Sequence, residues 1–213
     1  KQSAPERITL EFFKLLNSHN YFRALKYAFS NGLLNEILFF DNKKLLDNIK
    51  ALSKFNAFLK KMPEKYRAKF NEPFSQGLSY LGLLRAEQLL YNSSYSRNNL
   101  RLSRAILKRL GSTEKALTDY TKLKRITKKQ IFDLFERAGD AVMDFAVLTR
   151  RKRLLDDAER FLNIKQALST KKIIGITGAR GPEIGKLIKE MRCLQFIGKI
   201  NNENDAVGWL SGL

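Results

Sequence analysis

Apolar residues recur at three- and four-residue intervals along almost the whole chain, and the strict alternation that is typical of strands is scarce. The first apolar stripe consists of Ile8, Phe12, Leu15 and Leu16. A longer stripe runs through 45–59. This pattern predicts an all-α fold.

The links between the stripes are short, so we expect an elongated array of antiparallel helices. Two helices are expected before residue 40, the first ending near 17–20 and the second running from about 21 to 31. A long helix should run from 42 to the residue before Met62-Pro63. Further helices are expected at 74–91, 97–110, 113–123, 128–138, 140–153 and 154–168. Ser3-Ala4-Pro5-Glu6 and Thr127-Lys128-Lys129-Gln130 have the form of capping boxes.

The pattern changes at 169–178, where β-branched residues are interrupted by glycines. Gly181 and Pro182 then begin another helix, with glycine at the cap and proline at the first helical position. Asn202 caps a last short helix. We therefore expect a small helical tail domain after a longer array. The three expected parts are 1–40, 41–168 and 169–213.

The charge of the chain is strongly one-sided. Its 40 Lys and Arg residues stand against 21 Asp and Glu residues, which gives a formal charge of +19 and a pI near 10.1. A polyanion is the partner that this excess favours. No apolar run approaches the roughly 20 residues of a spanning helix and no signal peptide is evident, so we expect a cytoplasmic protein with no membrane partner. The single cysteine, Cys193, lies in an apolar stretch and is expected to be a buried thiol.

Basic residues are concentrated between 97 and 129, where only Glu114 and Asp119 oppose them. Spacings of four, three and four place four of them on one face of the expected helix, where they can follow a phosphate backbone. These four are Arg97, Arg101, Arg104 and Lys108. The others in the segment are Arg109, Lys115, Lys122, Lys124, Arg125, Lys128 and Lys129. A solvated helix face is the alternative interpretation, and the charge of the whole chain favours nucleic-acid binding.

Two shorter segments carry further candidates for RNA binding. One is the cluster Arg150, Arg151, Lys152 and Arg153. The other is a glycine-rich turn at 178–186, which runs into a helix N-terminus. Free backbone N–H groups and the helix dipole at that terminus can bind one phosphate, with Arg180 and Lys186 close by. The alternative is an ordinary turn between two helices.

Candidate catalytic groups are few. The chain has no Walker loop and no spaced cluster of metal ligands. Asp140 and Asp144 lie four residues apart and Asp156-Asp157 are adjacent, so either pair could be imagined to hold magnesium. We favour a structural role for both pairs, because Asp140 stands at an expected helix start. No catalytic and no metal-binding residue is predicted.

The residues at both ends resemble one known family. Glu6-Arg7-Ile8, Glu11 and Lys14-Leu15-Leu16 resemble the motif at the neck of class II tRNA nucleotidyltransferases. The stretch from Ala24-Leu25 to Gly32-Leu33-Leu34 looks like the continuation of that neck, and 181–187 is similar to the tail motif of the family. The segment between 41 and 168 matches the family in its general residue pattern more than in any specific motif. The resemblance implies a helical neck (1–40), body (41–168) and tail (169–213).

The resemblance also implies what this chain lacks. In the family, an N-terminal head carries the catalytic carboxylates and the segment that selects the incoming base, and this chain contains neither. We therefore expect the chain alone to be non-catalytic and to hold no cofactor. Mg²⁺ with ATP or CTP is expected only for a complete parent enzyme. A catalytic head, in the same parent chain or as a separate subunit, is an expected partner.

The resemblance assigns roles to two sets of residues. Glu6, Arg7 and Glu11 would be a buried or half-buried polar set that braces the neck, and the alternative is a surface helix with an Arg7–Glu11 pair. The tail would contact the tRNA elbow, where the T and D loops meet. The residues we choose for this contact are Arg180, Lys186, Lys189 and Arg192.

Together these observations predict the tRNA-binding portion of an enzyme that adds nucleotides of the 3′-terminal CCA. The body would follow the acceptor and T arms through phosphate and sugar contacts, with little reading of base sequence. Two alternatives stay open: the RNA-binding part of a bacterial poly(A) polymerase, and a basic helical scaffold that binds an acidic protein. The sequence does not say which nucleotides a parent enzyme would add.

Overall fold

The computed structural model describes residues 4–38, 41–93 and 100–213, and it confirms the all-α prediction with a helical content of 75%. The α-helices, in chain order, are α1 (Ala4–Asn17), α2 (Tyr21–Ser30), α3 (Leu33–Leu38), α4 (Asn42–Lys60), α5 (Glu64–Arg67), α6 (Tyr80–Leu89), α8 (Arg104–Thr121), α9 (Lys128–Ala138), α10 (Val142–Leu148), α11 (Lys152–Asn163), α12 (Thr170–Thr177), α13 (Pro182–Ile197) and α14 (Glu203–Ser211). The short 3-10 helices are η1 (Ala68–Asn71) and η2 (Gly139–Ala141). Within the described residues, the strands are β1 (Pro73–Ser75) and β2 (Leu78–Ser79), which pair antiparallel.

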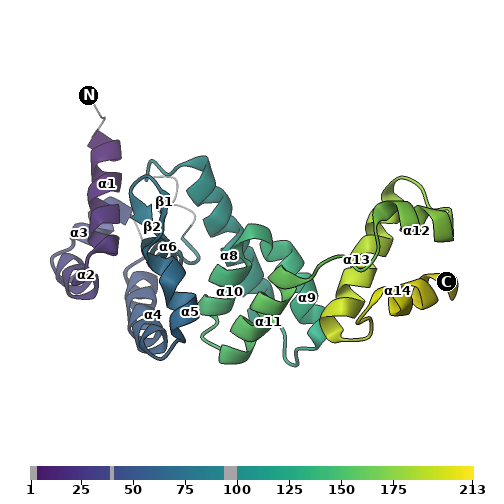
Figure 1. Ribbon diagram of the computed structural model, residues 1–213. Coiled ribbons are helices and arrows are strands. Elements are labelled where there is room, and N and C mark those ends of the chain that lie inside the picture. Colours follow the sequence, from purple (N-terminus) through teal and green to yellow (C-terminus); the bar gives the residue numbers. More distant parts are fainter. Residues whose placement is uncertain (1–3, 39–40, 94–99) are drawn as a thin grey trace.

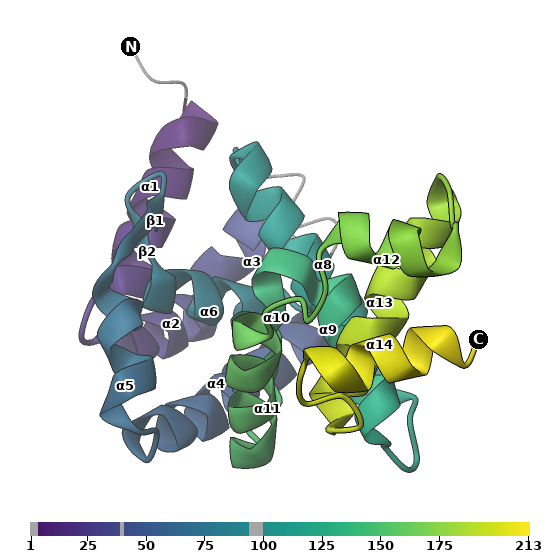
Figure 2. The same ribbon diagram turned by 45° about the vertical axis from the view of Figure 1, so that its right-hand side comes forward.

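The helices form an elongated array (Figure 1). Helices α1–α3 lie at one end and α12–α14 at the other, with α8–α11 between them, and the view turned by 45° keeps this order (Figure 2). Neighbouring helices pack in pairs, as α4 does with α6, α8 with α9, and α10 with α11. Helix α13 packs against α9 and so joins the last three helices to the rest.

Side-chain caps fix several helix starts. Asp41 accepts a hydrogen bond from the backbone N–H of Lys44 at 2.9 Å and begins α4. The capping box expected at 127–130 is present at the start of α9, which confirms that prediction. Asn202 caps α14 as expected. The capping box expected at Ser3 lies outside the described residues.

Three predicted helices are wrong in extent. The segment 74–91 begins with the β1–β2 hairpin, because Gln76 and Gly77 both adopt positive φ angles, 51° and 75°, in its two-residue turn. The expected helices 97–110 and 113–123 are largely one helix, α8, which begins only at Arg104. Ser103 caps it, and the Gln76 side chain bonds the non-helical backbone at 101–103.

Two groups of buried apolar residues hold the array together. The larger runs from Phe12 to Phe196 and includes Phe132 and Phe135, whose rings contact the Phe161 ring edge-on and at a tilt, respectively. The smaller consists of Leu168, Ile173, Met191, Ile200, Ala206 and Leu210. Helix α13 contributes to both groups, since its Cys193 is buried in the larger one, as the sequence predicts. The division of the chain at 40 and 168 stays a prediction.

Candidate nucleic-acid interface

The four residues predicted to share one helix face do not all do so. Arg97 lies outside the described residues. Arg101 is exposed but precedes α8, so its assignment to the helix face is wrong. Arg104 and Lys108 are exposed on the first turns of α8, and the Lys108 amine pairs with the Asp140 carboxylate at 2.9 Å. This pairing lowers the pKa of Asp140 and partly neutralises Lys108.

The turn between α10 and α11 holds the 150–153 cluster, and its four residues divide into two kinds. Arg150 has a φ of 58° and donates a hydrogen bond from Nη1 to the Ala51 carbonyl at 3.3 Å, which ties the turn to α4. The Arg151 guanidinium lies 5.6 Å from the centre of the Tyr120 ring. Lys152 and Arg153 are exposed in the first turn of α11. Three of the four therefore present charge at the surface, and Arg150 is structural.

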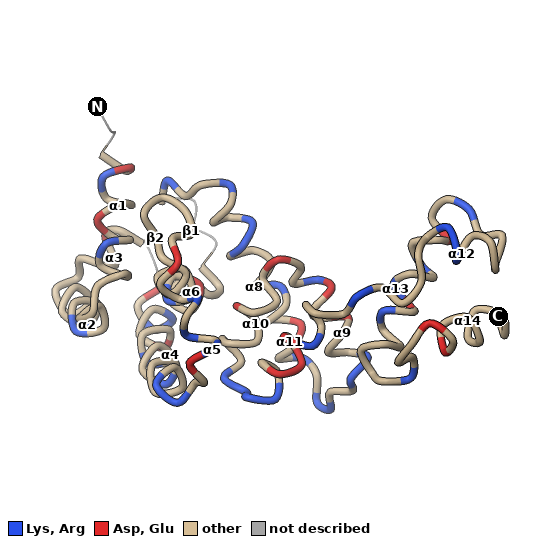
Figure 3. Tube along the Cα trace, in the orientation of Figure 1, with Lys and Arg blue, Asp and Glu red and all other residues tan. Residues whose placement is uncertain are grey.

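The loop between α8 and α9 lies beside that turn. It carries Lys124 and Arg125, and the first turn of α9 adds Lys128 and Lys129. All four are exposed, and within the described residues no carboxylate pairs with any of them. Figure 3 shows the loop and the turn at the same edge of the molecule. We call the set formed by these four residues with Arg151, Lys152 and Arg153 the basic edge.

Two helices begin at the basic edge. Helices α9 and α11 both begin there, and neither has an acidic residue in its first turn. The N-terminal end of a helix dipole is positive, so each cation placed there costs about 0.3–1 kcal/mol at an exposed site. Helix α11 also lacks a side-chain cap, because its N-cap residue is Arg151. The arrangement is electrostatically unfavourable for the isolated chain and favourable for a bound anion.

A hollow of about 420 Å³ lies within the basic edge. It is lined by Tyr120, Thr121, Leu123, Lys124, Ile126 and Arg151. The lining therefore contains two cations and no carboxylate. The sequence shows both basic segments, but nothing in it places Lys124 next to Arg151, 27 residues apart in numbering. The juxtaposition depends on how α8 packs against α10.

The RNA-binding candidates in the tail also divide into exposed cations and one structural residue. Arg180, Lys186 and Lys189 are exposed, and α13 begins with Pro182 at its first position, as predicted. Arg192 is half-buried instead: its guanidinium pairs with the Glu136 carboxylate at 3.0 Å and lies 5.3 Å from the Phe161 ring centre. Arg192 therefore holds α13 against α9 and α11, and its role in RNA binding stays a prediction.

The predicted burial of the neck residues is wrong. Glu6, Arg7 and Glu11 are all exposed, and Glu11 pairs with Lys14 at 2.7 Å. The reason is the orientation of α1, which buries the face that carries Phe12, Phe13 and Leu16. The bracing role given to these three residues stays a prediction.

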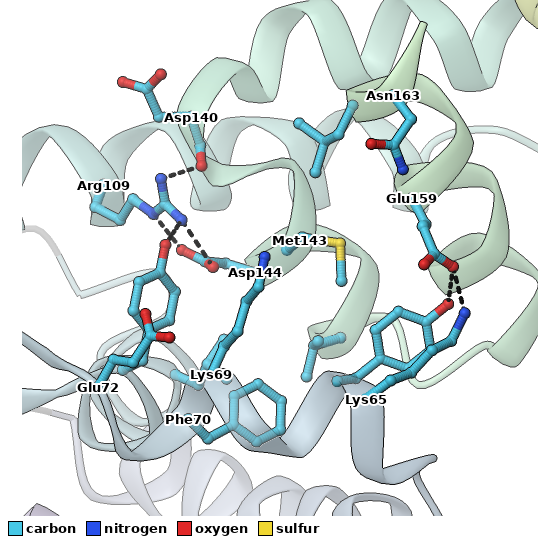
Figure 4. Close-up of a pocket in the computed structure, with 15 residues that line it drawn as sticks. Lys65, Lys69, Phe70, Glu72, Arg109, Asp140, Met143, Asp144, Glu159 and Asn163 are labelled. Atoms are coloured by element: carbon cyan, nitrogen blue, oxygen red, sulfur yellow. Dashed lines mark hydrogen bonds and ion pairs between the residues drawn. The ribbon is translucent and has the colours of Figure 1, made fainter.

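A second cavity, of about 420 Å³, lies between the α5–η1 segment and helices α10 and α11 (Figure 4). Arg109 is buried on one side of it, where its guanidinium bonds both oxygens of Asp144, the carbonyl of Asp140 and the Tyr80 hydroxyl. On the other side, Lys65 and the Tyr66 hydroxyl contact Glu159 at 2.5 and 2.8 Å and lower the pKa of its carboxyl group. Most charges of this cavity are paired internally, so it is a weaker anion site than the basic edge.

A scan against models of protein families found no match, and neither did searches of curated proteins and of solved structures. Over 4–38, 41–93 and 100–213, no three His, Cys, Asp or Glu side chains are grouped so that they could hold a metal ion. No helix in these ranges has the length and apolar character needed to cross a membrane.

Proposed function

We propose that this chain binds tRNA through the basic edge. The observation that carries the proposal is that two helices with first-turn cations begin near one hollow whose lining has no carboxylate. A polyanion bound there interacts with seven basic side chains and with the positive ends of two helix dipoles. It also offsets the repulsion that these groups exert on one another in the free chain.

Structured RNA fits this edge better than an acidic protein does. Phosphates repeat at regular short intervals along an RNA strand, and the edge presents cations in two adjacent segments without intervening acids. Contacts of this kind read the shape of an A-form helix and not its base sequence. The resemblance of 6–16 and 181–187 to the neck and tail of class II tRNA nucleotidyltransferases selects tRNA among structured RNAs.

The same resemblance defines the larger function that we propose. The chain is the tRNA-binding portion of an enzyme that adds nucleotides of the 3′-terminal CCA, and the catalytic carboxylates belong to a separate head. Mg²⁺ and ATP or CTP are needed by that head alone. The exposed tail residues Arg180, Lys186 and Lys189 supply a second contact, at the tRNA elbow.

The test is a salt titration of tRNA affinity with two matched double variants. Lys128→Ala with Lys152→Ala removes one exposed first-turn lysine from each of α9 and α11. Lys43→Ala with Lys44→Ala removes two exposed first-turn lysines from α4, and is the control. Both variants lose the same charge from the same kind of helix position, so their stabilities should change alike.

We expect the basic-edge variant to lower tRNA affinity roughly tenfold at moderate salt and to reduce the slope of log affinity against log salt by about two. The α4 variant should lower affinity less than about twofold. Equal losses in both variants would contradict a localised interface. Affinity that does not fall with salt would contradict RNA binding altogether and leave the acidic-protein scaffold. Equal affinity for tRNA and single-stranded poly(A) would favour the poly(A) polymerase alternative.

A further inference from the structure

The hollow in the basic edge has the composition of a site for a single phosphate with its adjoining sugar. Its charged groups, Lys124 and Arg151, come from two different connecting segments. Thr121 adds a hydroxyl, while Leu123 and Ile126 form an apolar wall. A volume of about 420 Å³ exceeds what one phosphate fills and lies in the range of small-ligand sites, about 300–1,000 Å³.

Arg151 is already positioned for such a ligand. Its guanidinium lies over the Tyr120 ring, and that ring is held in turn by an edge-on contact with Phe145, whose ring centre is 5.7 Å away. Phe145 is fully buried, so the support is rigid. A guanidinium that already contacts an aromatic ring loses less freedom when it bonds a phosphate through its planar N–H fork.

The start of α11 provides a further reason for an anion in the hollow. Arg151 is the N-cap residue of α11, and it offers no side-chain acceptor to the first backbone N–H groups of the helix. The first backbone N–H groups of α11 therefore lack a side-chain acceptor, which favours an anion near this end of the helix.

We infer that the hollow binds one backbone phosphate of the RNA, together with its ribose, and thereby fixes where the strand crosses the basic edge. The inference rests on the proposed function for the source of the phosphate. It goes beyond that function because it gives Arg151 a specific contact with one phosphate. A general basic surface would let any other cation replace Arg151. Lys124 completes the site from the opposite segment, and Leu123 and Ile126 contact the sugar.

The decisive variant is Arg151→Lys, which keeps the charge and loses the stack on Tyr120 and the planar fork. We expect it to weaken tRNA binding about fivefold while the salt slope stays unchanged. Arg151→Gln should weaken binding further and lower the slope by about one. The control is Arg160→Lys, an equivalent change at an exposed residue in the last turn of α11, outside the basic edge and the hollow. Unchanged thermal midpoints would show that all three variants are folded.

A direct measurement uses small probes on the full chain. Titration with AMP, followed by amide chemical shifts, should move the signals of 120–126 and 151–154, and inorganic phosphate should move the same signals less. If AMP changed amide chemical shifts only around the hollow and the chain did not bind tRNA, the proposed function would be overturned. The phosphate site itself would still be supported. This inference would be overturned if AMP left the amide signals around the hollow unchanged and Arg151→Lys bound tRNA as tightly as the wild type. Normal tRNA binding in that case would leave the proposed function standing.

Discussion

At the scale of single residues, charged groups have two opposite roles in this chain. Arg109 is buried and satisfies its donors on Asp144, the Asp140 carbonyl and Tyr80, so it joins α8 to α6, η2 and α10. Glu87 lies in the same interior and accepts a hydrogen bond from the Thr113 hydroxyl at 2.7 Å. The cations of the basic edge are exposed and have no such partners among the residues that the structure describes. Burial and pairing therefore separate structural from functional charge, which residue type alone does not.

Glu87 makes the stability of the fold depend on pH. Burial, and then the negative charge of Asp144, raise the pKa of Glu87 well above its ordinary value of 4.5. The folded chain thus holds a proton that the unfolded chain loses above about pH 4.5. The free energy of unfolding therefore falls as pH rises through 4.5 and keeps falling until the folded-state pKa is reached, by at most about 1.4 kcal/mol per pH unit.

Glu87→Gln should remove this component. The amide keeps the size of the side chain and the acceptor for Thr113, and it carries no titrating proton. Chemical denaturation between pH 4 and 8 should show a variant that is more stable than the wild type near neutral pH and less dependent on pH. Burial raises the pKa of Asp144 as well, so some dependence should persist in the variant. Parallel stability curves for the two proteins would exclude a protonated Glu87.

At the scale of the element, local signals predicted helix starts better than helix lengths. The capping box at Thr127 and the Gly181-Pro182 start act within one turn, so they can be read from neighbouring residues. The start of α8 could not be read in this way. It depends on Gln76, which bonds the backbone of Arg101 and Ser103 from a hairpin more than twenty residues earlier. Tertiary contacts of this kind override the periodicity that predicted a helix from residue 97.

Two glycines inside helices differ in the space around them. Gly82 in α6 faces the end of α1 so closely that an added Cβ would lie 2.2 Å from Asn17 Oδ1 and 2.7 Å from Leu78 Cδ1. Asn17 cannot easily move, because its side chain bonds the Gly77 carbonyl and both the backbone N–H and the hydroxyl of Ser79. Gly111 in α8 has open space where its Cβ would lie.

The same substitution should therefore have opposite effects at the two positions. Gly82→Ala should destabilise the fold by about 2 kcal/mol, because the methyl group overpacks the contact between α1 and α6. Gly111→Ala should stabilise it by about 0.5–1 kcal/mol through its effect on helix propensity and on the entropy of the unfolded chain. Urea denaturation measures both. An unchanged or stabilised Gly82→Ala variant would refute the packing argument at Gly82.

At the scale of the whole molecule, the array separates the basic edge from the exposed cations Arg180, Lys186 and Lys189 of the tail. The basic edge lies at the ends of α8–α11, and the α12–α13 turn lies toward the far end of the chain (Figure 1). All-α architecture could be predicted from periodicity, because each helix reports its own buried face. The basic edge could not be predicted from periodicity, since it forms only where α8, α9, α10 and α11 bring two connecting segments together. Net charge predicted a polyanion without saying where it binds.

This separation predicts that the tail recognises RNA size and shape more than charge. Arg180→Ala with Lys186→Ala removes two exposed cations at the start of α13. The variant should weaken tRNA binding more than it weakens a short single strand, because only a ligand as long as a tRNA reaches both the basic edge and the tail. Filter binding with the two ligands at one salt concentration measures the difference.

The control for the tail is a variant of equal charge at the opposite end of α13. Lys165→Ala with Lys199→Ala changes two exposed lysines there, near Gln195, whose side chain bonds the Lys165 carbonyl. It should reduce affinity for both ligands by a similar, small factor, since unspecific attraction falls with charge wherever the charge is removed. If the Arg180 and Lys186 variant also lost affinity equally for tRNA and for the short strand, the tail would contribute charge alone, and the elbow contact proposed for it would be wrong.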